Sequence, residues 1–175
     1  MSRDWEKTSE ETKYEGKLGT VRIETHRHAD GEEVTREVVA HPGAVGILAH
    51  DETHVWLVRQ PREAVGERTL EVPAGKYDVD GEDPLATAKR ELAEEVGLAA
   101  EQWTELPWFF TSPGFTDERV DLYEATGLST AQADAEEEER IEIVRWPLDD
   151  LDAAIAQCHD SKSLIALLLL RIRLP

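Results

Sequence analysis

Apolar and polar residues alternate near the start of the chain, which is the pattern of a half-buried β-strand. Val21 and Ile23 are flanked by polar residues, and a valine-rich stretch, VTREVV, follows the pair Asp30-Gly31. An Asp-Gly pair between two such stretches favours a tight hairpin turn. We therefore predict an antiparallel strand pair, the N-terminal hairpin, within residues 18–40. The polar segment before it, residues 1–17, is expected to be loose or peripheral.

The middle of the chain carries further short apolar stretches that are bounded by turn residues. AVGILA and HVWLVRQ predict a second strand pair, joined by a turn near Asp51. A short strand that ends in Pro73 and Gly75 follows, and three later stretches also have the composition of strands. In chain order these four sequences are TLEVPAG, WFFT, RVDLYEATGL and IEIVRW.

Two segments have the spacing of helices. Within residues 84–96, apolar residues recur three and four positions apart and form one stripe. Asp83 suits the N-cap of this helix, and Gly97 suits the position just after its end. The tail from about Leu148 predicts one or two helices, with a break near residues 157–160.

Strands dominate the middle of this pattern, with one internal helix and one terminal helical segment. We find no internal repeat and no boundary of a second domain. The chain therefore predicts a single domain over residues 18–175, of the α/β (α+β) class, in which helices cover a mixed sheet.

The composition is strongly acidic, with 19 basic and 38 acidic residues and a net charge of −19. Nucleic acids and anionic membrane surfaces need a basic patch, so neither is expected as a partner. A single cysteine, Cys158, cannot form an internal disulfide, and the polar N-terminus does not resemble a secretory signal. These features favour a cytoplasmic protein without a membrane span.

The acidic residues of the helix at 84–96 have an unusual arrangement. Glu91 and Glu95 are four residues apart and share one face, Glu94 lies beside them, and Arg90 can pair with Glu94. One interpretation is a solvated face with a single ion pair. The other is a site for a divalent cation, which would relieve the repulsion between the carboxylates. Their oxygens suit Mg²⁺ or Mn²⁺.

The segment from Gly75 to Leu98, GKYDVDGEDPLATAKRELAEEVGL, resembles the Nudix box. The box pattern is a glycine, five residues, a glutamate, seven residues and then Arg-Glu, an aliphatic residue, any residue, Glu-Glu, any residue, a glycine and an aliphatic residue. Glu82 is the first acid, and every position from Arg90 onward matches in register. The chain departs from the pattern once, because six residues rather than five separate Gly75 from Glu82. The helical part is unaffected.

This resemblance implies a Nudix-type α/β/α sandwich and hydrolysis of a nucleoside diphosphate linked to another group. It implies metal ligands at Glu91 and Glu95, with Glu94 near the ions and the carbonyl of Ala74 as a further ligand. Arg90 would orient Glu94 without contacting the metal. Two or three Mg²⁺ or Mn²⁺ ions would activate water and neutralise charge at phosphorus.

The stretch TSPGFTDE at 111–118 resembles the ADP-ribose pyrophosphatase subgroup of that family. This likeness implies that ADP-ribose and water give AMP and ribose 5-phosphate. Arginines on the preceding strands would grip the diphosphate, although each could also be a surface charge. The candidate substrate contacts are Arg36, Arg59, Arg62, Ser112, Pro113 and Glu118.

The acidic stretch ADAEEEER resembles the loop that closes over the site in this subgroup, and its likeness suggests a catalytic base at Glu139 or, second, Glu137. The subgroup also implies a homodimer that exchanges N-terminal strands. Two alternatives stay open. The chain could hydrolyse another nucleoside diphosphate derivative, or it could bind ADP-ribose as a sensor without cutting it.

Overall fold

The computed structural model describes residues 4–79, 81–131 and 140–174. Two compact units share the chain. One contains residues 1–43 and 110–119, and the other contains residues 44–109 and 120–175. The chain therefore leaves the second unit once, at 110–119, and returns to it.

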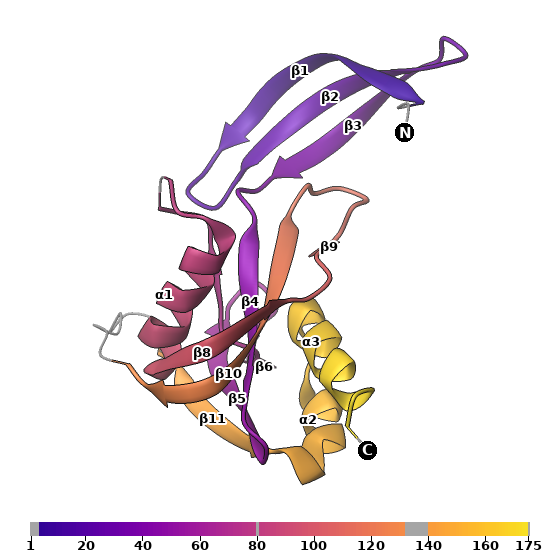
Figure 1. Ribbon diagram of the computed structural model, residues 1–175. Coiled ribbons are helices and arrows are strands. Elements are labelled where there is room, and N and C mark those ends of the chain that lie inside the picture. The colour runs from indigo at the N-terminus through magenta and orange to yellow at the C-terminus, as the bar shows by residue number, and fades with distance from the viewer. Residues whose placement is uncertain (1–3, 80, 132–139, 175) are drawn as a thin grey trace. The chain divides into compact units, whose positions relative to one another are not determined.

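The first unit is built on a three-stranded antiparallel sheet (Figure 1). Its strands are β1 Trp5–Glu15, β2 Thr20–His28 and β3 Glu33–Ala40, with β2 in the centre. The predicted hairpin is confirmed as β2 and β3. Its turn contains Gly31, whose φ of 91° is a value that glycine adopts without steric cost.

Strand β1 lies in the polar segment that was expected to be loose. All eleven of its residues are exposed, so no apolar periodicity marks it in the sequence. The strand forms because β2 supplies its backbone partners, from Trp5 opposite His28 to Glu15 opposite Thr20. Two register irregularities, after Lys7 and after Thr12, interrupt this pairing.

Residues 110–119 are joined to the end of β3 by backbone and side-chain hydrogen bonds. The amide of Val39 donates to the carbonyl of Phe115 at 2.8 Å, and the Thr116 hydroxyl donates to the carbonyl of Val39 at 2.7 Å. The carboxylate of Asp117 accepts from the amide of His41 at 2.8 Å and pairs with Arg22 at 3.2 Å. The loop is thereby part of the first unit.

The second unit contains a mixed sheet whose main path runs β11-β5-β4-β10-β8, with β6, β7 and β9 paired to β5, β4 and β10. Strands β4 and β10 are parallel, and the other neighbours are antiparallel. The strand bounds are β4 Ala44–His50, β5 His54–Arg62, β6 Glu67–Glu71, β7 Ala74–Lys76, β8 Leu98–Glu105, β9 Phe109–Phe110, β10 Arg119–Thr130 and β11 Glu142–Pro147.

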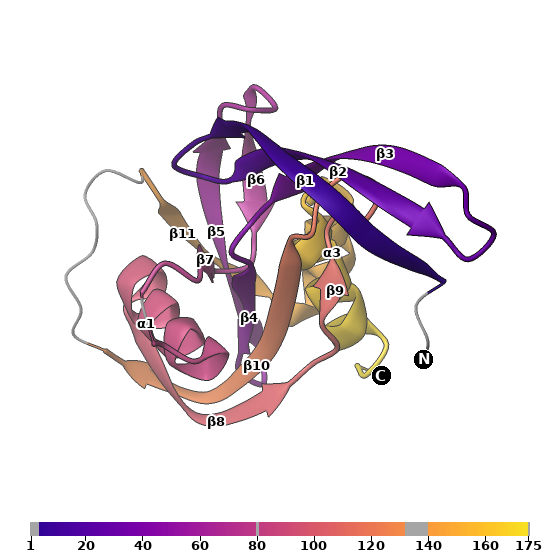
Figure 2. The same cartoon turned by 90° about the horizontal axis from the view of Figure 1, so that it is seen from above.

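Helices cover both faces of this sheet (Figures 1 and 2). Helix α1, Pro84–Val96, lies on one face, and α2, Leu151–Gln157, and α3, Ser161–Arg171, lie on the other. A short 3₁₀ turn, Leu148–Asp150, precedes α2. The α/β/α sandwich and the mixed sheet are therefore confirmed, as are the helix at 84–96 and the break between two terminal helices.

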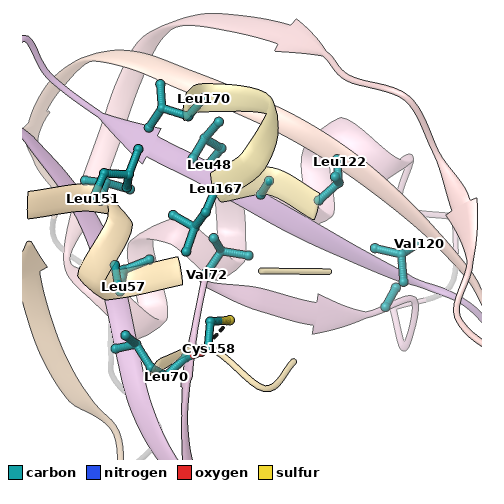
Figure 3. Close-up of a cluster of buried hydrophobic side chains, with 14 residues drawn as sticks. Leu48, Leu57, Leu70, Val72, Val120, Leu122, Leu151, Cys158, Leu167 and Leu170 are labelled. Atoms are coloured by element: carbon teal, nitrogen blue, oxygen red, sulfur yellow. Dashed lines mark hydrogen bonds between the residues drawn. The ribbon is translucent and has the colours of Figure 1, made fainter. Parts of the chain in front are cut away.

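Each face of the sheet has its own apolar cluster. On the α1 side, Ala88, Leu92 and Val96 pack against β4, β5 and β10. On the other side, Leu167 and Leu170 of α3 join a second cluster, which Figure 3 shows. Strand β4 is buried along both faces, which explains its continuous apolar sequence.

Two strand predictions needed correction. Residues 98–105 form β8, which the apolar pattern did not predict because most of its residues are exposed and its apolar residues do not alternate with polar ones. The stretch TLEVPAG forms two short strands rather than one, because the chain leaves β6 at Val72 and pairs with β4 only from Ala74. Among the described residues, no helix is long and apolar enough to cross a membrane.

Candidate active site

Helix α1 presents its three glutamates in a fixed orientation because both of its ends are capped. The Asp83 carboxylate accepts from the amide of Ala86 at 2.9 Å, and Gly97 closes the other end with a φ of 69°. Ala88 and Leu92 are fully buried under the helix. The acidic face at Glu91, Glu94 and Glu95 is therefore turned away from that core.

The backbone at Ala74 and Gly75 lies directly against this acidic face. A β-carbon added at Gly75 would fall 1.9 Å from Cδ of Glu91, a distance that no packing permits. The Glu95 carboxylate accepts from the amide of Ala74 at 3.0 Å. The glycine is thus required so that the Glu91 carboxylate can reach the strand that starts at Ala74.

Arg90 connects the acidic residues of the helix with those of the loop before it. Its guanidinium lies 2.8 Å from both Glu91 and Glu94, and it also pairs with Asp78 at 3.2 Å and Glu82 at 3.3 Å. The predicted Arg90–Glu94 pair is confirmed, but it is one of four. The inserted loop is therefore tied to the helix through an arginine that neutralises several acids.

The electrostatics at Glu91 differ from those of a surface carboxylate. Burial raises the pKa of Glu91 to about 7, and the neighbouring Glu94 adds to this rise, although Arg90 opposes it. Burial by itself would lower the pKa of Arg90, but the surrounding carboxylates outweigh it and raise that pKa. The Glu91 carboxylate therefore lacks full compensation and would gain from a further positive charge.

These residues fit a divalent cation. The donors beside Gly75 are carboxylate oxygens, which hard cations prefer, and the glycine leaves room that a β-carbon would fill. Within the part of the chain that the structure describes, no three His, Cys, Asp or Glu side chains form a ready-made metal cluster. Arg90 pairs with Glu91 and Glu94 instead, so a cation would exchange with the guanidinium for these oxygens.

Arg62, at the end of β5, is held by a buried carboxylate. Glu71 is 1 % exposed and accepts from both Nε and Nη2 of Arg62 at 2.7 Å. Hydrogen bonding to Glu71 raises the pKa of Arg62, and attraction from Glu95 contributes to this rise. Arg59 lies on the same strand, and its carbonyl accepts from Arg68 at 3.0 Å.

The first unit contains a groove of about 410 Å³. Arg36 of β3 and Pro113 of the 110–119 segment both line it. Ser112 accepts from the amides of Phe115 and Thr116 through its carbonyl. Glu118 accepts from the Thr111 hydroxyl at 2.7 Å and thereby closes the same loop. The structure thus brings Arg36 and Pro113 together, whereas Ser112 and Glu118 shape the loop.

The comparisons with known proteins agree with this geometry. A family model described as NUDIX domain matches residues 40–168. The chain belongs to the Nudix family.

Three curated relatives span most of this Nudix protein. An ADP-ribose pyrophosphatase of Mycobacterium tuberculosis is 45 % identical over 82 % of this chain and 70 % of its own length. A methanol dehydrogenase activator of Bacillus methanolicus is 37 % identical over 91 % of this chain and 89 % of its own. An ADP-ribose pyrophosphatase of Bacillus subtilis is 36 % identical over 96 % of this chain and 94 % of its own length.

A solved structure also resembles this Nudix chain. It is the crystal structure of an ADP compounds hydrolase, which superposes with a TM-score of 0.84 and 25 % sequence identity. The likeness covers 97 % of this chain and 93 % of that one. It therefore includes both compact units.

Sequence reasoning missed Glu71, the buried carboxylate that pairs with Arg62. Glu71 lies in the predicted strand TLEVPAG, and nothing in that stretch distinguishes a buried, paired carboxylate from an exposed one. The predicted bases Glu137 and Glu139 lie outside the described residues.

Proposed function

We propose that this Nudix hydrolase cleaves the diphosphate of ADP-ribose, giving AMP and ribose 5-phosphate. The observation that carries the proposal is the contact of two α1 carboxylates with the short strand β7, Glu91 against Gly75 and Glu95 against Ala74. Two relatives that match most of this chain are named ADP-ribose pyrophosphatase, and this favours the substrate.

Nudix hydrolases generally use divalent metal ions, and the acidic face fits them. We assign Glu91 and Glu95 as carboxylate ligands, with Glu94 beside them and the carbonyl of Ala74 as a further oxygen. Two or three Mg²⁺ or Mn²⁺ ions bound there would supply activation of water and neutralisation of charge on the diphosphate. Arg90 would orient Glu94 and would give up its pair with Glu91 to bound ions.

The remaining candidates act on the substrate itself. Arg62 presents a guanidinium that Glu71 holds in place, which suits a contact to a diphosphate oxygen. Arg36 and Pro113 line the groove of the first unit, whose volume of about 410 Å³ lies in the range of small-molecule sites. Arg59, Ser112 and Glu118 complete the proposed set. Glu139, with Glu137 second, remains the sequence-based candidate for the base.

A second candidate function keeps the reaction and changes the substrate. The relatives carry different names, and one of comparable similarity is a methanol dehydrogenase activator, so resemblance alone does not choose the substrate. A sensor that binds without cutting is disfavoured, because the acidic face of α1 is complete and positioned against Gly75. The homodimer and the cytoplasmic location stay predictions.

The test is a substrate panel with the purified protein in Mg²⁺ and, separately, in Mn²⁺. ADP-ribose, other nucleoside diphosphate sugars, a dinucleotide and an oxidised nucleotide would be incubated, and the products would be separated by chromatography. We expect AMP and ribose 5-phosphate from ADP-ribose at the highest kcat/KM. Intact ADP-ribose with both metals would refute the proposal, and faster turnover of another compound would favour the second candidate.

A further inference from the structure

A cluster of four charged residues, Arg62, Glu71, Asp160 and Lys162, joins α3 to β6, the strand that precedes β7. Glu71 lies at its centre and accepts from Arg62, from the Thr69 hydroxyl at 2.5 Å and from Lys162 Nζ at 2.5 Å. Lys162 also pairs with Asp160 at 2.9 Å. The two acids and two bases of this cluster balance in charge, which a buried carboxylate requires.

Lys162 reaches Glu71 from the first turn of α3. Its side chain is 12 % exposed, and its Cδ lies 3.8 Å from the point where Gly46 of β4 would carry a β-carbon. That separation is ordinary van der Waals contact, so the lysine stem packs beside β4. An ammonium group brought this far into the protein is held by its two carboxylate partners rather than by water.

The same junction between α2 and α3 holds the residues on either side of Glu71. The Cys158 thiol donates to the carbonyl of Leu70 at 3.2 Å, as Figure 3 shows, and the Ser163 hydroxyl accepts from the amide of Val72 at 2.8 Å. Residues 70–72 therefore each form a hydrogen bond with a residue between the end of α2 and the first turn of α3. They lead directly to Ala74 and Gly75.

The geometry at Arg62 shows what this support can do. Glu71 occupies the edge of the guanidinium formed by Nε and Nη2, and it does not use the edge formed by Nη1 and Nη2. A bidentate contact to a diphosphate needs such an edge. The Arg62 side chain is 44 % exposed, so a ligand can reach it.

We infer that Lys162 is a positioning residue for substrate binding, because it shares the charge of Glu71 and so keeps the Arg62 guanidinium turned toward the diphosphate. This inference rests on the proposed function, in which Arg62 contacts substrate. Without Lys162, Arg62 alone must compensate a buried carboxylate. The guanidinium is already paired with Glu71 through Nε and Nη2, so the carboxylate would then neutralise more of its positive charge and leave less for the ligand.

The first test compares Lys162→Met with the wild-type enzyme in ADP-ribose hydrolysis. We expect KM to rise by about tenfold and kcat to change by less than about threefold, which is the signature of lost binding rather than lost chemistry. Lys162→Arg, which keeps the charge, should restore most of the KM. The control is Arg171→Met on the same helix, which removes an exposed ion pair with Asp152 and should leave KM unchanged.

A double-mutant cycle shows whether Lys162 acts through Arg62. In an Arg62→Ala background, Lys162→Met should raise KM no further, because the residue that it positions is gone. An additive rise in KM would overturn the inference and assign Lys162 a general structural role. A wild-type KM in Lys162→Met would also overturn it.

A substrate-free measurement separates failure of this inference from failure of the proposed function. The Nε–H resonance of Arg62 in ¹⁵N-labelled protein reports its bond to Glu71, and we expect it to shift in Lys162→Met but not in Arg171→Met. An unshifted resonance overturns the inference even if ADP-ribose is not the substrate. If Lys162→Met does not fold, Lys162→Gln, which keeps a donor for Glu71, carries the same measurements.

Discussion

Two glutamates of this protein, the partly buried Glu91 and the buried Glu71, lie in opposite electrostatic surroundings. Burial raises the pKa of Glu91 to about 7, because the single arginine beside it is shared with three other acids. Burial acts on Glu71 in the same direction, but hydrogen bonds from Arg62 and attraction from Lys162 outweigh it and lower that pKa to about 2. The first carboxylate suits a cation, and the second already has its cations within the protein.

Glu71 should make the folded state sensitive to acid. Its pKa is lower in the folded protein than the value of 4.5 for an ordinary glutamate, so its stabilising contribution is present above pH 4.5. That contribution is lost as the pH falls from 4.5 towards about 2. By the relation between pKa shift and free energy it amounts to roughly 3 kcal/mol.

Urea unfolding of the wild-type protein and Glu71→Gln at several pH values measures this effect. We expect the variant to be less stable at pH 7 and the difference in unfolding free energy to narrow steadily below pH 4.5. Glu101→Gln, on the exposed surface of β8, is the control and should show a small, constant difference. A difference in unfolding free energy between Glu71→Gln and wild type that does not change with pH would contradict the lowered pKa of Glu71.

Glu95 should be essential for catalysis but not for folding. Glu95→Gln keeps an oxygen that can accept from the amide of Ala74, so the contact between α1 and β7 should stay in place. The charge that a divalent cation needs is lost, and we expect activity to fall by about a hundredfold or more. Steady-state kinetics over a Mg²⁺ titration, with Glu101→Gln as control, measures the loss. Near-normal turnover at low Mg²⁺ would show that Glu95 is not a metal ligand.

At the scale of secondary structure elements, the site depends on how closely α1 approaches β7. Gly75→Ala should push the Glu91 side chain out of its position, because a β-carbon there would fall 1.9 Å from Cδ of Glu91. We expect metal affinity to weaken by about tenfold or more, with a parallel loss of activity. Isothermal titration with Mn²⁺ measures the affinity.

The matched control for this element is the same substitution in a Glu91→Ala background. If Gly75→Ala acts by displacing Glu91, it should cause no additional loss of metal affinity once that side chain is absent. An equal loss in both backgrounds would show that the glycine matters for another reason.

At the scale of the whole molecule, the N-terminal strands are the predicted dimerisation element. The three-stranded sheet has β1 and β3 as edge strands, and such edges offer backbone groups to another chain. Deleting residues 1–40 would also remove the partners that Val39 provides to Phe115 and Thr116. We expect a monomer or an aggregate with lost affinity for ADP-ribose. Light scattering that shows an intact, active dimer would reject this prediction.

Local chemistry determined most elements of this protein in advance. The stripe of apolar residues, the capping aspartate and the terminal glycine define α1 as Pro84–Val96, and the Asp-Gly pair marks the hairpin of β2 and β3. The spacing of glutamates on one helix face likewise indicated the cation chemistry. These signals lie within one or two turns of chain, so the sequence carries them directly.

Contacts between distant residues decided the rest. Strand β1 has no apolar pattern of its own and exists because β2 pairs with it. Gly75 lies 16 residues before Glu91 in the sequence, and only the folded chain shows that the two are in contact. Glu71 and Lys162 are 91 residues apart, and their pairing depends on α3 packing over β4 and β6. Burial and long-range pairing set the charge state and orientation of a side chain, and the neighbouring residues in the sequence determine neither of them.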